Sequence, residues 1–80
     1  MPRLPQISGR AFIQLLHSLG YETVRQRGSH VRLRKTTPIG EHNITVPDHK
    51  TLAKGTLNDL LTHVSLWNGI SKEELINRIK

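Results

Sequence analysis

The sequence predicts an α+β fold in which two amphipathic helices flank three antiparallel strands, with a short extra helix at the C-terminal end. Three observations favour it. Apolar residues recur at helical spacing near both ends of the chain, the middle alternates apolar and polar residues, and glycine or proline separates the segments. A chain of 80 residues is the size of one domain with a modest core, so we expect a single domain over residues 1–80.

The first helix is predicted over 9–18. Ser8 is a suitable N-cap, because its hydroxyl can accept a hydrogen bond from a free backbone N–H of the first turn. Gly20 suits the left-handed conformation that commonly follows a helix. The apolar stripe of this helix consists of Phe12, Leu15, Leu16 and Leu19.

A β-hairpin is predicted next, with a strand over 21–27, a two-residue turn at Gly28-Ser29 and a return strand over 30–35. Glycine tolerates the positive φ that a type II′ turn requires at its first central position. The return strand alternates, so we expect Val31 and Leu33 to face the core. The opposite face then carries His30, Arg32 and Arg34.

Residues 36–41 are predicted to form a loop, and 42–46 a third strand that ends at Pro47. Ile44 and Val46 should face the core, whereas Asn43 and Thr45 should extend the polar face. A second helix is expected to be capped by Thr56, with an apolar stripe of Leu57, Leu60, Leu61 and Val64. Ser71 and Glu74 have the spacing of a capping box for the last helix.

Both long helices need an apolar surface to cover, and one face of the antiparallel sheet supplies it. The other face is then left open to solvent. This α-β-β-β-α order with helices on one face resembles the fold of double-stranded-RNA-binding domains, although a fold by itself does not establish a function.

Charge and cysteine content narrow the class of function. Lys and Arg number 12 against 6 acidic residues, a net charge of +6, which favours a polyanionic partner. The absence of cysteine excludes disulfides, thiolate metal ligands and a cysteine nucleophile, and it favours a cytoplasmic setting. We expect no signal peptide and no membrane association, since the opening residues contain two prolines and no apolar run is long enough to span a bilayer.

His30 is the sharpest candidate for chemistry, because it follows the turn and shares its face with arginines. A neutral imidazole is what a general base requires near neutral pH, and arginine binds phosphate oxygens. The alternative is a solvated strand histidine without a task. Lys50 and Lys54, close to a helix N-terminus, suit a phosphate, although ordinary capping by Thr56 explains that position equally well.

A metal site is not expected. His49 lies beside Asp48, but no spacing typical of a metal site accompanies them. His42 shares its strand face with Ile44 and is expected to be partly buried. Aromatic residues are few, so base stacking should contribute little to recognition.

Several motifs together resemble the HicA (YcfA-like) toxins of type II toxin–antitoxin systems. They follow one another along nearly the whole chain: Ser8-Gly9-Arg10, Gly20-Tyr21-Glu22, the run 25–31 with Gly28-Ser29-His30, the run 46–50, Lys54-Gly55-Thr56-Leu57 and the run 70–74. The resemblance implies an mRNA interferase that acts without ribosomes, with His30 as its catalytic residue. It also implies a HicB-like antitoxin that covers the site.

Under this resemblance, we expect metal-free cleavage of RNA with no cofactor, in which His30 removes the proton of a 2′-hydroxyl. The general acid stays open among Lys54, His49 and water. A non-catalytic double-stranded RNA-binding module is the alternative, and a DNA-binding regulator is weaker because the sheet interrupts any helix-turn-helix pairing. The expected RNA-binding residues are Arg27, Gly28, Ser29, Arg32, Arg34, Lys50 and Lys54.

Overall fold

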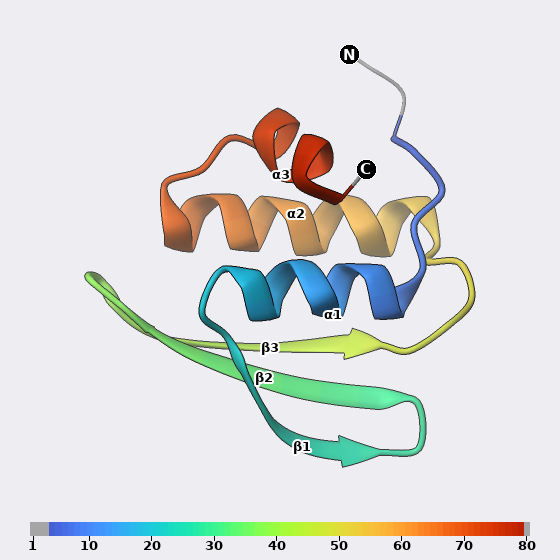
Figure 1. The fold of residues 1–80 in the computed structure, drawn as a ribbon, viewed down its shortest axis with the longest axis horizontal. Helices are drawn as coiled ribbons and strands as arrows, with labels where there is room; N and C mark the ends of the chain where they lie inside the picture. Colours follow the sequence, from blue (N-terminus) through green and yellow to red (C-terminus); the bar gives the residue numbers. More distant parts are fainter. Residues whose placement is uncertain (1–3, 80) are drawn as a thin grey trace.

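The computed structural model describes residues 4–79 and confirms the predicted order of elements, α-β-β-β-α-α (Figure 1). The three strands form one antiparallel sheet in the order β1-β2-β3. All three helices lie on one side of this sheet, and the other face is uncovered (Figure 1). The bounds are α1 Gly9–Ser18, β1 Glu22–Arg27, β2 His30–Thr37, β3 Gly40–Pro47, α2 Lys54–Asn68 and α3 Lys72–Ile79.

Two predicted boundaries were wrong. The loop over 36–41 is largely sheet, because β2 and β3 pair as far as Thr37 opposite Gly40 and leave a turn of two residues. The Thr37 hydroxyl closes this turn by donating to the carbonyl of Gly40 at 2.8 Å. Helix α2 begins at Lys54 with Ala53 as its N-cap, and no side chain caps it, so Thr56 lies inside the helix.

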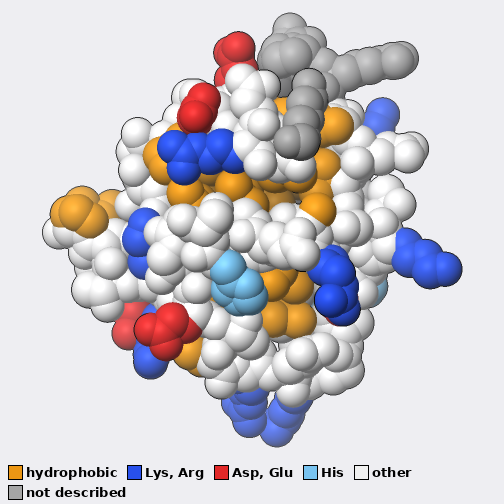
Figure 2. All heavy atoms as spheres, viewed as in Figure 1, with side chains coloured by type: hydrophobic (Ala, Val, Ile, Leu, Met, Phe, Trp, Pro, Cys, Tyr) orange, Lys and Arg blue, Asp and Glu red, His pale blue; other side chains and the backbone are white. Residues whose placement is uncertain are grey.

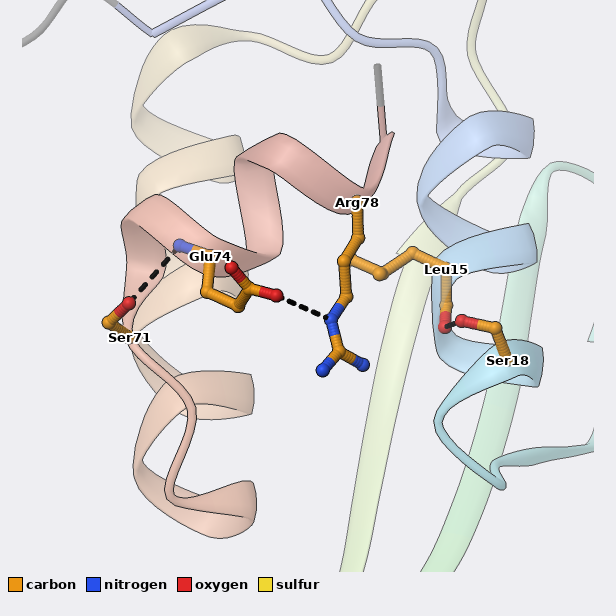
Figure 3. A network of polar contacts seen from close by, with 5 residues as sticks. All are labelled: Leu15, Ser18, Ser71, Glu74 and Arg78. Carbon is orange, nitrogen blue, oxygen red and sulfur yellow. Dashed lines mark hydrogen bonds and ion pairs between the residues drawn. The ribbon is translucent and has the colours of Figure 1, made fainter.

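The predicted N-cap of α1 is confirmed, and the capping box predicted for α3 forms only in its first half. Ser8 caps α1 by accepting a hydrogen bond from the backbone N–H of Ala11 at 3.0 Å. At α3, the hydroxyl of Ser71 accepts from the N–H of Glu74 at 3.1 Å (Figure 3). The Glu74 carboxylate does not close the second half of a capping box, because it pairs with Arg78 at 3.2 Å instead.

The core lies between the helices and the covered face of the sheet. Predicted core residues such as Phe12, Leu33, Val46 and Leu61 are fully buried. The apolar side chains visible between the helices and the sheet belong to this layer (Figure 2). Among the described residues, no helix has the length and apolar character needed to cross a membrane.

A polar network is built into one end of this core. His42 is 5% exposed, and its ring stacks on Trp67 with 4.8 Å between the ring centroids. Its Nδ1 is hydrogen-bonded to the hydroxyl of Tyr21, which also accepts from the side-chain amide of Asn68 at 2.9 Å. Burial raises the pKa of Tyr21, with the hydrogen bond from Asn68 acting in the opposite direction.

The N-terminus of α1 packs tightly on the connector that follows β3. The N–H of Gly9 donates to the carbonyl of His49 at 2.8 Å, and the N–H of Asp48 donates to the carbonyl of Ser29 at 2.6 Å. Gly9 is required by this approach, because a Cβ at its position would lie 2.0 Å from the carbonyl oxygen of Pro47. The connector therefore ties the β1–β2 turn to the start of α1.

A β-bulge at Val24 interrupts strand β1. Thr23 pairs with Leu33 on the covered face, but the next pair is Arg25 with Arg32, so one extra residue lies between them. Simple alternation from Thr23 would turn Arg25 and Arg27 toward the helices. The extra residue reverses this phase, so both arginines lie on the open face.

Candidate nucleic-acid interface

The open face of the sheet carries the polar residues that alternation predicted. His30, Arg32 and Arg34 of β2 are exposed, as are Asn43 and Thr45 of β3. His30 is the first residue of β2 and pairs with Arg27 on one side and with Pro47 on the other. It therefore lies at the end of the sheet formed by the β1–β2 turn.

A shallow cavity surrounds His30 on this face. Its volume is about 180 Å³, and it is lined by Arg25, Arg27, His30, Arg32 and Thr45. In Figure 2, lysine or arginine side chains project from the lower edge of the molecule, where β1 lies in Figure 1. The site thus brings three arginines and one histidine to the same exposed cavity.

Sequence reasoning missed Arg25 as a member of this site. Arg27 is set opposite His30 by the two-residue turn, and Arg25 has the same parity as Arg27 in the strand. Counting back from the turn would have found it, whereas counting forward from Tyr21 places it on the wrong face. The bulge between the two ends of β1 makes these counts disagree.

Arg34 lies on the same face but not in the same site. Its guanidinium pairs with the carboxylate of Glu41 on β3 at 3.7 Å. On the other side, Glu22 of β1 is its cross-strand neighbour. Arg34 lines a separate cavity of about 550 Å³ at the other end of the sheet, together with these two acidic residues. The open face is therefore purely cationic near His30 and of mixed charge near Arg34.

The turn and the two lysines are close to this end of the sheet. Gly28 has a φ of 55°, while Ser29 does not have a positive φ, which is the combination expected of the predicted turn. Lys50 lies on the connector and Lys54 begins α2, whose N-terminus is at the same end of the molecule as the turn (Figure 1). Both lysines are exposed, and neither lines the cavity around His30.

The remaining histidines have other surroundings. His42 is buried, as the strand pattern indicated, and burial lowers its pKa, with the charge of His63 adding to the effect. His17 is exposed on α1 and hydrogen-bonded to the Thr23 hydroxyl at 2.9 Å. Within residues 4–79, no three His, Asp or Glu side chains gather into a group suited to a metal ion.

Fold and surface together define a small basic α+β protein with an uncovered, cationic sheet face. Residues 9–66 match the family model described as HicA toxin of bacterial toxin–antitoxin, and the chain belongs to this family. Membership makes it a toxin with an antitoxin partner. No curated protein and no solved structure matches the chain, so the likeness to double-stranded-RNA-binding domains stays a prediction.

Proposed function

We propose that this toxin is an mRNA interferase that cleaves RNA by acid–base chemistry at His30. The observation that carries the proposal is the position of His30, exposed in a shallow cavity whose other charged residues are Arg25, Arg27 and Arg32. A substrate that fits such a surface has negative charge on its backbone and a proton that an imidazole can remove. RNA has both features, because its 2′-hydroxyl adjoins a phosphodiester.

In the proposed reaction, the neutral imidazole of His30 removes the proton of a 2′-hydroxyl. The 2′-oxygen attacks the adjacent phosphorus, the bond from phosphorus to the 5′-oxygen breaks, and the leaving oxygen takes a proton from a general acid. The products are a 2′,3′-cyclic phosphate and a 5′-hydroxyl end. The candidates for the general acid are Lys54, His49 and water.

Arg27 and Arg32 are proposed to hold the phosphate and to stabilise the charge that develops on its oxygens. General acid–base catalysis by one side chain contributes about 10²–10⁴-fold. A site with one histidine on an open surface is therefore expected to be slow, which suits a toxin that depletes messages over time. Lys50, Lys54 and the backbone of Gly28-Ser29 are proposed to contact the flanking strand.

The test is incubation of the purified protein with labelled RNA, followed by analysis of the product ends. His30→Ala should lose cleavage by about 10²-fold or more and keep its circular dichroism spectrum. His63→Ala, which removes another exposed histidine from α2, should cleave like the wild type. Full activity of His30→Ala would refute the assignment, and binding without any cleavage by the wild type would favour a non-catalytic RNA-binding module.

Two further measurements separate the parts of this proposal. EDTA should leave cleavage intact, and complete loss of activity in EDTA would argue for a metal-dependent reaction instead. We also propose that the antitoxin is HicB-like and covers the cavity around His30. The partner should then block cleavage by the wild type and still bind His30→Ala.

A further inference from the structure

Like charges face one another beside His30. Arg25 is the direct cross-strand partner of Arg32, and Arg27 is the partner of His30. Side chains directly opposite on one face of an antiparallel pair have Cβ atoms about 4.5–5.5 Å apart, and like charges at that spacing are destabilising. The sheet therefore places cations together at a cost to its own stability.

The other described arginines have carboxylate partners. Arg10 pairs with Asp48 at 3.7 Å, Arg34 with Glu41 at 3.7 Å, and Arg78 with Glu74 at 3.2 Å. Arg25, Arg27 and Arg32 take part in no ion pair within the described part of the chain. An unpaired cationic cluster that opposes folding is typical of a functional surface, because a bound polyanion supplies the missing charge.

The bulge at Val24 is what builds this cluster. It turns Arg25 onto the open face while Thr23 stays on the covered face, where its hydroxyl bonds His17 at 2.9 Å. Bulges re-aim side chains and recur beside active sites. Val24 itself is 41% exposed, so the extra residue does not add a side chain to the core.

We propose that Arg25 is a phosphate-binding residue of this site, and that it acts with Arg32 to hold the RNA backbone beside His30. The inference rests on the proposed function and names a residue for it. Arg25 and Arg32 line the same cavity as His30. His30 and Arg32 are two residues apart on β2, which separates them by roughly 7 Å along the strand. One extended strand of RNA passing over the turn end of the sheet can therefore contact both arginines and the imidazole.

The same surface indicates that recognition is by backbone charge. Phe12 and Tyr21 are buried in the core, and Trp67 stacks on His42 at the junction of β3 and α2. None of them is available on the open face for base stacking, which is the usual means of gripping unpaired bases. Contacts to phosphates carry no sequence information.

The test measures binding of a short single-stranded RNA in the His30→Ala background, so that the RNA stays uncut, over a range of salt concentrations. Each lost phosphate contact lowers the slope of log affinity against log salt by about 0.7 for single strands. Arg25→Ala should show this loss and an affinity at least about tenfold lower at low salt, since hydrogen bonds to charged groups contribute about 1.5–3 kcal/mol. Arg25→Lys should restore the slope but only part of the affinity, because it keeps the charge and loses the planar fork.

Arg78→Ala is the charge-matched control, because it removes one positive charge from α3 on the other side of the molecule. Its slope should equal that of the parent. A wild-type slope and affinity for Arg25→Ala would overturn the inference, and so would an equal effect of Arg78→Ala. Unfolding in urea provides a second readout, since Arg25→Ala should not lower stability, whereas a purely structural role for Arg25 would.

The outcomes for Arg25 and for the proposed function are separable. If the wild type does not cleave RNA but Arg25→Ala lowers the salt slope, the nuclease assignment fails and the binding residue stands. If the wild type cleaves and Arg25→Ala binds and cleaves equally well, the nuclease assignment stands and Arg25 is excluded.

Discussion

Replacing Gly9 with alanine tests the packing that supports the turn end of the sheet. An added Cβ would lie 2.0 Å from the Pro47 carbonyl oxygen, 2.8 Å from the Asp48 Cα and 2.9 Å from the His49 nitrogen. All three are backbone atoms, so no side chain can rotate away to make room. The start of α1 must therefore separate from the connector by more than an ångström.

The cost follows from two contributions. Forcing an extra carbon into a packed site costs about 1–3 kcal/mol. Separation also breaks the 2.8 Å hydrogen bond from the Gly9 N–H to the His49 carbonyl, and such a bond contributes about 0.5–1.5 kcal/mol. The expected loss is about 2–4 kcal/mol, which for a domain of this size lowers Tm by roughly 8–30 °C.

Thermal and urea unfolding followed by circular dichroism would measure this loss. Gly55→Ala is the matched control, because Gly55 lies in α2 and a Cβ added there meets no other part of the described chain within 4 Å. Alanine is favoured over glycine in a helix by about 0.5–1 kcal/mol, so this variant should be as stable as the wild type or more stable. Wild-type stability of Gly9→Ala, or equal destabilisation by both variants, would refute the packing argument.

Two further predictions concern the buried polar network. Tyr21→Phe should cost about 1–3 kcal/mol in urea unfolding, because it removes the hydroxyl that bonds the buried His42 Nδ1 and one of the two hydrogen bonds that the Asn68 amide donates; an unchanged urea midpoint would contradict this. Burial lowers the pKa of His42 below 6.5, so the unfolded chain binds that proton more tightly than the folded one. Stability should therefore be fully present above pH 6.5 and fall as the pH drops below this value. Urea midpoints compared at about pH 7.5 and 5.5 should show the fall in the wild type and a smaller one in His42→Gln; equal falls would exclude His42 as the cause.

Features that depend on local chemistry could be predicted from the amino-acid sequence alone. The apolar spacing and the Ser8 cap placed α1 at 9–18, where the structure has it. The two-residue turn at Gly28-Ser29 fixed where β2 begins, and its alternation put His30 and Arg32 on the open face. These inferences succeeded because caps, turns and strand alternation each depend on a few neighbouring residues.

Which charges share a site depends on how the strands pair, and this could not be predicted. The bulge at Val24 turns Arg25 toward the open face. Alternation counted forward from Tyr21 and alternation counted back from the turn place Arg25 on opposite faces, and only the pairing of β1 with β2 decides between them, because an extra residue in one strand has no fixed sequence signature. Arg34 has the same parity as His30, yet Glu41 on β3 pairs with it at 3.7 Å. Strand alternation assigns a side chain to a face, but its neighbours on that face come from other strands, and their register sets which cations stay unpaired.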